Sequence, residues 1–192
     1  MKRRDADDTR RRIFEAATAE FGAHGIAGAR IDRIAAAAGA NKQLIYAYFG
    51  NKRELFDTVV SGHLARLLDE APFDPTDLPA HAASIFDHYI RHPELARLGA
   101  WHALDPAEAG HRIAALESVI KARTAAVKHA QRAGKISDTI PAADLLAMVA
   151  NLASMWAVPT QEWSPPGGIT PAQARRHRAA LLEAVRRLVE PA

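Results

Sequence analysis

The sequence contains no cysteine among its 192 residues. A disulfide scaffold, a cysteine zinc site, an iron–sulfur cluster and a thiol redox switch are therefore excluded. No segment approaches the roughly 18 consecutive apolar residues that a transmembrane helix needs. The charged start Met1–Asp5 is not followed by the apolar segment of a secretory signal. We therefore expect a cytoplasmic protein that makes no use of a membrane.

The sequence is also poor in strand signals, because alternation of β-branched and polar residues is nearly absent. Alanine, leucine and arginine recur instead at helical spacing, and the apolar fraction of 48% is typical of a folded protein. We predict an all-α fold, with capping residues, glycines and prolines setting the helix ends. The predicted helices are 9–23, 31–38, 42–48, 52–71, 79–91, 94–104, 107–133, 141–156 and 171–189.

The net charge of +3 lies entirely in the first third of the chain. Residues 1–60 contain 11 of the 25 lysines and arginines but only 8 of the 22 acidic residues, whereas residues 61–192 are neutral. A basic segment on a neutral body indicates an anionic partner, and nucleic acid is the first candidate. The alternative is an ordinary solvated face, because an excess of this size is common.

Two short predicted helices, 31–38 and 42–48, flank the turn Gly39–Asn41 within this basic third. This spacing is typical of a helix-turn-helix, although a helical hairpin used only for packing has the same pattern. Ile45 and Phe49 are four residues apart, so we expect both to face inward on the second helix.

The opposite side of that second helix carries Lys42, Gln43 and Tyr46, with Asn41 directly before it. Lysine, glutamine and asparagine are the side chains that read base edges, and tyrosine and lysine also suit phosphate oxygens. Lys52 begins the next helix, where we expect free backbone N–H groups to attract a phosphate as well. These residues therefore form a candidate DNA-reading surface.

The residues in and around this motif resemble those of a known protein family. Residues 10–60 resemble the N-terminal domain of the TetR family of transcriptional regulators, and the block from Ile45 to Leu55 is highly specific to it. The resemblance implies an N-terminal three-helix DNA-binding domain at 1–52 and a larger helical effector-binding and dimerisation domain at 53–192. The matching segments are Arg12–Ala17, Phe21–Gly25, Ile31–Ala35 and Ala38–Leu55.

The resemblance also implies roles for individual residues. Tyr46 and Tyr48 are similar to the tyrosines that hold the DNA backbone, and Lys52 to a lysine that contacts phosphate. Lys42 and Gln43 occupy base-facing positions. The complete set of expected DNA contacts is Arg30, Asn41, Lys42, Gln43, Tyr46, Tyr48 and Lys52.

Three positions differ from the usual family pattern. Arg30 stands where threonine often touches phosphate, Leu44 where threonine is frequent, and Ala47 where histidine or a larger aromatic residue is usual. Leu44 removes a polar contact and offers contact with a thymine methyl instead. The operator sequence is therefore not transferable from a relative.

The function implied is that of a sequence-specific DNA-binding regulator, a repressor released from a palindromic operator by a small-molecule effector. We expect the partners to be double-stranded DNA, the effector and a second copy of the chain. We expect the homodimer to form through the helices 141–156 and 171–189, although the same residues would serve equally as ordinary core. The residues expected at this interface are Leu145, Val149, Leu152, Leu181, Val185 and Leu188.

Aromatic residues, histidines and methionines gather in the predicted middle helices, and apolar pockets with a few polar groups are typical ligand sites. Plain core is the alternative interpretation. The expected effector-binding residues are Phe86, Tyr89, Trp101, His102, Met148 and Trp156.

His88 and His92 are four residues apart, a spacing that can hold a metal. We favour two exposed histidines near a helix end instead, and we expect no metal and no cofactor.

Two other classes of function compete with a regulator. A helical enzyme is disfavoured because the sequence has no glycine-rich phosphate loop, nucleophile elbow or His-Glu-x-x-His motif. We therefore expect no catalytic residue. A helical protein-interaction module is the remaining alternative, and salt distinguishes it, because DNA affinity falls steeply with ionic strength. The effector, the operator and the regulated genes are not readable from the sequence.

Overall fold

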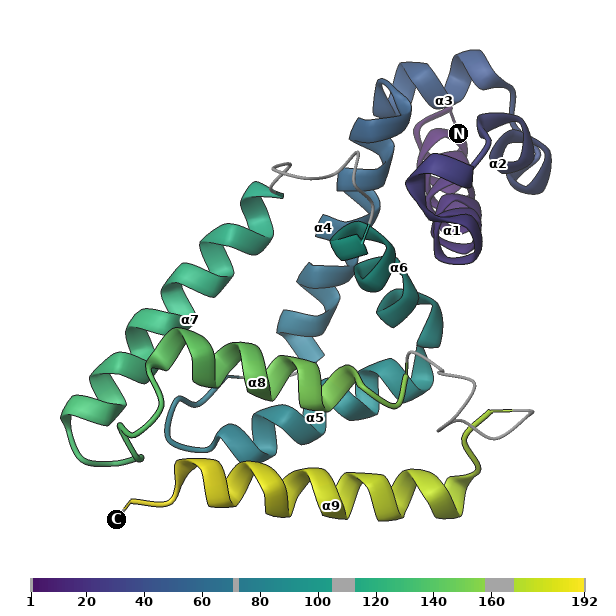
Figure 1. The fold of residues 1–192 in the computed structure, drawn as a ribbon. Coiled ribbons are helices and arrows are strands. Elements are labelled where there is room, and N and C mark those ends of the chain that lie inside the picture. The colour runs from purple at the N-terminus through teal and green to yellow at the C-terminus, as the bar shows by residue number, and fades with distance from the viewer. Residues whose placement is uncertain (1, 71–72, 105–112, 158–167, 192) are drawn as a thin grey trace. The chain divides into compact units, whose positions relative to one another are not determined.

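The computed structural model describes residues 2–70, 73–104, 113–157 and 168–191, with residues 2–4 and 102–104 described by their backbone alone. These residues form helices joined by short connections (Figure 1), as the sequence predicts. No helix in this part of the chain combines the length and apolar character needed to cross a membrane. The helices are α1 (Lys2–Gly28), α2 (Ile31–Ala38), α3 (Lys42–Phe49), α4 (Lys52–Glu70), α5 (Leu78–Arg91), α6 (Pro93–Leu104), α7 (Ala114–Arg132), α8 (Ala142–Ser154) and α9 (Pro171–Val189).

The capping residues read from the sequence explain several helix ends. Thr170 caps α9 in a reciprocal capping box with Gln173, and Pro171 occupies the first turn. The predicted first helix was too short, because α1 begins at Lys2 rather than near Thr9. The Thr9 hydroxyl does not cap a helix start; it donates a hydrogen bond to the Asp5 carbonyl one turn earlier. At the other end Gly25 interrupts the helical backbone with φ 64°.

Contacts within the chain divide it into two compact units. Unit 1 comprises Met1–Leu64 and Glu94–Ile113, and unit 2 comprises Ala65–Pro93 and Ala114–Ala192. Helix α4 is therefore continuous through both units. The predicted boundary after residue 52 concerns DNA and effector binding, and it stays a prediction.

Unit 1 places α1 against α2 and α2 against α3, with the first part of α4 and α6 completing it. Its centre contains Ile13, Phe21, Ile34 and Phe56, each with no exposed side-chain surface. The rings of Phe21 and Phe56 meet edge to face at 5.2 Å. Gly22 allows α6 to approach closely, because a Cβ there would lie 3.2 Å from the Glu94 carbonyl oxygen.

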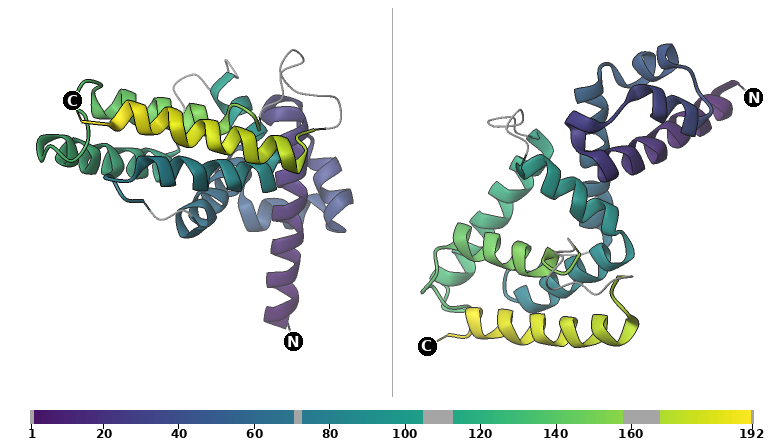
Figure 2. Two further views of the ribbon diagram at one scale, coloured as in Figure 1. Left: turned by 90° about the horizontal axis from the view of Figure 1, so that it is seen from below. Right: turned by 45° about the vertical axis from the view of Figure 1, so that its right-hand side comes forward.

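Unit 2 is built around α5, which packs against α8 and α9 (Figure 2), while α7 packs against α8. The core between these helices corrects one prediction. Leu145, Val149, Leu181 and Val185 are at most 1% exposed within a single chain, so they form core and are not available to a second copy. The other two expected interface residues, Leu152 and Leu188, are partly buried against the same core.

Candidate DNA-binding surface

The turn between α2 and α3 is fixed by three residues. Gly39 ends α2 in the left-handed conformation (φ 59°), which favours glycine. The Asn41 side-chain oxygen accepts a hydrogen bond from the Leu44 N–H at 2.8 Å and so caps α3. The Arg12 guanidinium, from α1, donates to the Ala38 carbonyl at 2.6 Å. The two short helices are thus held at a fixed angle, with the Asn41 oxygen already engaged.

A buried carboxylate fixes the start of α2 to α1. Glu20 is only 10% exposed and accepts hydrogen bonds from the Arg30 N–H (2.8 Å) and from Arg33 Nε (2.7 Å). Burial by itself raises the pKa of Glu20, but the bonds from Arg33 and Arg30 outweigh it and hold the pKa below its usual value. The carboxylate therefore stays ionised, and Arg33 is engaged in a structural ion pair with it.

Helix α3 has the two faces that its sequence predicts. Ile45 is fully buried and Phe49 is 6% exposed, so both point into unit 1 as expected. Lys42 and Gln43 are exposed, and Tyr46 is 47% exposed, a high value for a tyrosine that could otherwise pack. Burying one side of a short helix and presenting polar side chains on the other is the arrangement of a recognition helix.

The exposed face of α3 contains one ion pair that the sequence did not indicate. Lys42 Nζ lies 2.6 Å from Asp32 Oδ1 of α2, with both side chains more than half exposed. The hydrogen bond that Lys42 donates to Asp32 raises the pKa of Lys42. Because an ammonium has three N–H groups, Lys42 keeps donors for a further partner while it is paired with Asp32.

The start of α4 differs from the expectation of free backbone N–H groups. The Asn51 side-chain oxygen accepts from the N–H groups of Arg53 (2.9 Å) and Glu54 (3.0 Å). The Glu54 carboxylate accepts in return from the Asn51 N–H at 3.0 Å. A negative charge thus already lies at this helix end, so the prediction that its free N–H groups attract a phosphate was wrong for Arg53 and Glu54.

Lys52 reaches towards the end of α1. Its ammonium donates to the Ala29 carbonyl at 2.8 Å and lies 3.4 Å from the Ala27 carbonyl. Because an ammonium has three N–H groups, one donor remains for a phosphate oxygen. The phosphate contact of Lys52 stays a prediction, and the lysine also ties α4 to α1.

Arg30 and Tyr48 occupy different settings beside α3. In the described part of the chain the Arg30 guanidinium has no hydrogen-bond or ion-pair partner, and the side chain is exposed. Its charge opposes the raised pKa of Lys42, so the two cations lie within electrostatic range of each other. Tyr48 is partly buried, with its ring edge to face against Phe49 at 6.4 Å. Arg30 is therefore an exposed cation that no described carboxylate neutralises, and its phosphate contact stays a prediction.

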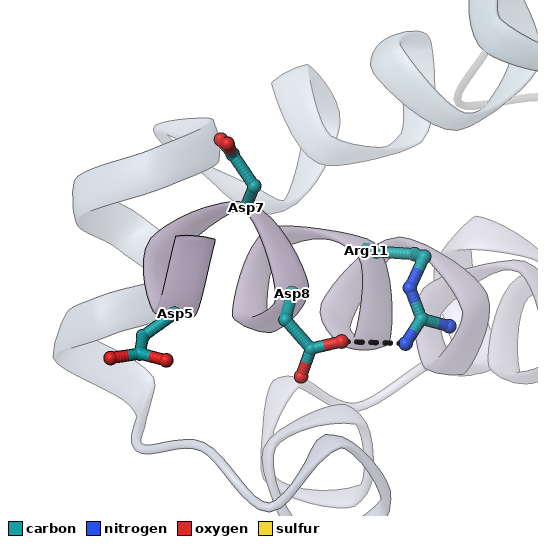
Figure 3. A pocket seen from close by; sticks show the side chains of 4 residues that line it. All are labelled: Asp5, Asp7, Asp8 and Arg11. Carbon is teal, nitrogen blue, oxygen red and sulfur yellow. Dashed lines mark hydrogen bonds and ion pairs between the residues drawn. The ribbon is translucent and has the colours of Figure 1, made fainter. Parts of the chain in front are cut away.

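The described side chains at the beginning of α1 are mainly acidic (Figure 3). Asp8 binds Arg11 at 2.6 Å, while Asp5 and Asp7 point away from that arginine. Arg11 also binds Glu15 at 2.9 Å, and the hydrogen bond from Arg11 holds the pKa of Asp8 below its usual value. Arg11 is thus occupied by two carboxylates and adds little positive charge for DNA.

Comparison with known proteins identifies the two parts of the chain. Residues 13–59 match the family model described as bacterial regulatory proteins, tetR family, and residues 77–187 match that of the tetracyclin repressor-like C-terminal domain. The chain belongs to the TetR family of transcriptional regulators. This is a family of DNA-binding regulators rather than of enzymes, and its members bind DNA operators and ligands and dimerise. The resemblance read from the sequence is confirmed.

Relatives cover most of this TetR-family chain. It is 48% identical over 160 residues to the HTH-type transcriptional repressor SCO4008 of Streptomyces coelicolor, with 82% of each protein covered. It is 35% identical over 106 residues to the HTH-type transcriptional repressor NicS of Pseudomonas putida, covering 51% of this chain and 50% of NicS. The crystal structure of SCO4942 from S. coelicolor, described as a transcriptional regulator, superposes with a TM-score of 0.77 at 33% identity, over 96% and 99% of the two chains.

The structure of this TetR-family chain does not gather all the expected effector residues. Phe86 lies in the core of unit 2 with its ring edge to face against Trp156 at 5.9 Å, and Tyr89 packs against the same core. Met148 is 47% exposed on α8. Trp101 belongs to unit 1, where it lies over Gly25. The side chain of His102 lies outside the described residues, and the effector role of this set stays a prediction.

His88 is buried rather than exposed, which corrects the interpretation of the His88 and His92 pair. His88 Nδ1 lies 3.0 Å from Glu70 Oε2, and the same carboxylate oxygen accepts from Arg91. Its ring is 5.2 Å from that of His92. Within the described ranges no group of three or more potential ligands is placed to hold a metal.

Asp32 and Glu20 are the residues of the DNA-binding unit that sequence reasoning missed. Each acts on a cation at least ten positions away along the chain, Lys42 for Asp32 and Arg33 for Glu20. Helical periodicity relates residues three or four positions apart, so it does not indicate pairs that are ten or more positions apart. One signal could have drawn attention to Asp32: it is an acidic residue within a basic segment and lies close to the recognition helix.

We expect Asp32→Asn to strengthen binding to DNA of any sequence by several-fold, because it removes the negative charge that pairs with Lys42 on the exposed face of α3. The gain should be largest at low salt, because screening weakens the attraction between exposed charges and phosphate. Fluorescence anisotropy with a random duplex, read across a salt series, measures both quantities. Asp138→Asn removes the same charge from an exposed position in unit 2 and is the matched control. Equal effects of the two variants would contradict a specific role for Asp32.

Proposed function

We propose that the chain is a homodimeric repressor, acting in the cytoplasm, that binds a palindromic operator and releases it when a small-molecule effector binds. The single observation that carries the proposal is the recognition helix α3, whose apolar face is buried while Gln43 and Tyr46 project from a scaffold of fixed geometry. Two relatives that are themselves named transcriptional repressors support the direction of regulation.

Base reading is assigned to the exposed face of α3. The Gln43 amide has no hydrogen-bond partner within the described residues, so its donor and acceptor are both available to an adenine edge. Lys42 and the free amide nitrogen of Asn41 complete the base-facing group. Arg30, Tyr46, Tyr48 and Lys52 are assigned to the sugar–phosphate backbone, where they set the register of α3 in the major groove.

Dimerisation is assigned to the outward face of α8. Met148 and Met155 are 47% and 52% exposed, and with Asp144 and Asn151 they follow the spacing of one helix face. Exposed alanines at 172, 179, 180 and 184 give α9 small residues that would allow close approach of a second copy. A helix-turn-helix dimer places its two recognition helices roughly 34–36 Å apart, or at a multiple, on successive turns of DNA.

Effector control is assigned to a shift between two conformational populations. An effector that binds better to a form with the wrong recognition-helix spacing lowers DNA affinity by its differential affinity, typically about 1–3 kcal/mol. Helix α4 is the element suited to transmit the change, because Lys52–Glu70 is one helix that begins in unit 1 and ends in unit 2.

The sharpest test of this assignment compares Gln43→Ala with Arg30→Ala. Gln43→Ala should change which operator bases are preferred, at a cost of about 1–3 kcal/mol at the affected position. Arg30→Ala should weaken all sequences about equally and reduce the salt slope by roughly 0.9. Selection of bound fragments from random duplexes, followed by anisotropy on the selected palindrome, measures both. Unchanged preference in Gln43→Ala would contradict the base-facing assignment, and salt-insensitive association would favour a protein-binding module instead.

A further inference from the structure

Arg123 of α7 has no acidic partner among the residues that the structure describes. In the described part of the chain its partners are a neutral ring nitrogen, His81 Nε2 at 3.1 Å, and the face of Phe73, 4.8 Å from the guanidinium carbon. The side chain is partly buried, and burial lowers its pKa. The guanidinium nevertheless stays charged, because arginine keeps its proton in proteins. A partly desolvated cation without a carboxylate partner favours an anion from elsewhere.

His81 holds Arg123 in place without cancelling its charge. The imidazole is 3% exposed, and burial, together with the nearby charge of Arg123, lowers its pKa to about 4. Because Nε2 accepts from Arg123, the neutral ring carries its proton on Nδ1, and this buried atom has no hydrogen-bond partner. The ring also meets Phe73 edge to face at 4.9 Å. The three side chains thus form a fixed group with a single positive charge.

A surface cleft of about 350 Å³ adjoins this group within unit 2. Apart from Arg123 its walls are apolar, and small-molecule sites typically measure ~300–1,000 Å³ with few polar groups. The cleft therefore combines an apolar wall with one cation. The residues that line it are Leu68, Phe73, Val119, Ala122 and Arg123.

We propose that this cleft binds a small apolar carboxylic acid, with its carboxylate on Arg123 and its hydrocarbon part against Leu68, Phe73 and Val119. A planar guanidinium matches a carboxylate in geometry and charge. A single cation with apolar walls suits one negative charge better than the two of a phosphate monoester. The inference deepens the proposed effector control and rests on it for its regulatory meaning, while the binding itself stands on the cleft. Neither Phe86 nor Trp156 is among the residues that line this cleft.

The test uses the full chain and three probes of equal chain length, each below its micelle concentration. Decanoate is expected to bind in calorimetry and to raise the melting temperature. Decanol and decylammonium are expected to bind at least tenfold more weakly, because neither presents an anion to Arg123. Decylammonium binding as tightly as decanoate would overturn the proposal, as would failure of decanoate to bind.

The variants separate charge recognition from folding. Arg123→Gln keeps a donor for His81 and should weaken decanoate by about tenfold to a hundredfold, the contribution of a hydrogen bond between charged groups. Arg123→Lys should retain part of the affinity. Lys121→Gln, an exposed position on the same helix, removes the same charge and should leave decanoate binding unchanged. Circular dichroism and operator affinity without probe confirm that each variant is folded.

The outcomes distinguish this site from the proposed function. Full decanoate affinity in Arg123→Gln, or an equal loss in Lys121→Gln, would overturn the site. Decanoate binding that depends on Arg123 supports the site, whether or not the operator is released. Release of the operator in the same titration tests effector control separately, so that the two proposals can fail independently.

Discussion

The double variant Met148→Glu with Met155→Glu is expected to be a folded monomer that no longer binds its operator tightly. Both methionines are about half exposed in the single chain, so the change should not disturb the core beneath them. In a dimer the same positions would bring four carboxylates into one apolar interface, and unpaired charge there is costly. The prediction therefore separates association from folding.

The expected loss of operator affinity is large because each chain supplies one recognition helix. A monomer reads one half-site, so its affinity should fall from the ~10⁻⁸–10⁻¹¹ M of specific complexes towards the ~10⁻⁴–10⁻⁶ M of non-specific binding. Sedimentation velocity measures the oligomeric state, and anisotropy on the selected palindrome measures affinity. At least a hundredfold loss is expected.

A matched control exists on α7. Ile120 is 53% exposed, so Ile120→Glu adds one carboxylate, half the charge of the double variant, at a comparably exposed apolar position. It should leave the dimer and the operator affinity intact. If the double variant remains a dimer, or if Ile120→Glu dissociates it equally well, the assignment of the interface to α8 is wrong.

Phe86→Ala is expected to destabilise unit 2 strongly rather than alter effector response alone. Phe86 is 2% exposed and its ring packs against Trp156, which itself stacks on His177 at 4.7 Å. Removing a buried phenyl ring costs about 3–5 kcal/mol, a large share of the ~5–15 kcal/mol that stabilises a domain. Urea denaturation followed by tryptophan fluorescence and circular dichroism measures the loss.

Tyr46→Ala is the comparison for this loss, because it removes an aromatic side chain that is 47% exposed. Its stability should change by no more than ~0.5 kcal/mol, whereas its DNA affinity should fall. Phe86→Ala with stability close to that of the parent chain would show that Phe86 lines an adaptable pocket rather than a close-packed core.

The helix-turn-helix was predictable because its determinants are local. Ile45 and Phe49 lie one helical turn apart, and their burial follows from that spacing alone. Gly39 and Asn41 mark a turn through backbone conformation and capping, both of which depend on near neighbours. The residues that carry the family resemblance lie in the same segment, so the resemblance supports the same prediction.

The surface proposed to meet a second copy was not predictable in the same way. Leu145 and Val149 have the spacing of an apolar face, but periodicity does not say whether the partner is the same chain or a second copy. The structure shows one side of α8 built from aliphatic residues in the core, while Met148 on the other side and Met155 directly after the helix are about half exposed. Only tertiary packing distinguishes them.

Contacts between residues far apart along the chain could not be predicted from the sequence, for the same reason. Arg123 and His81 are 42 positions apart, and Lys52 and Ala29 are 23 apart. Nothing in their local surroundings indicates either pair. The expected phosphate role of Lys52 came from the family, and the structure adds that the same ammonium also holds α1.

Trp101 lies over Gly25, where an added Cβ would be 3.1 Å from the indole ring, and both belong to unit 1 although 75 other residues separate them along the chain. The DNA-reading unit is consequently assembled from two stretches of sequence. A gene fusion that joins residues 1–64 to another regulator's sensing region would leave α6 behind. In such a chimera the space beside Gly25 would lack the indole ring of Trp101. An exchange of the DNA-binding unit therefore has to transfer both segments of the sequence.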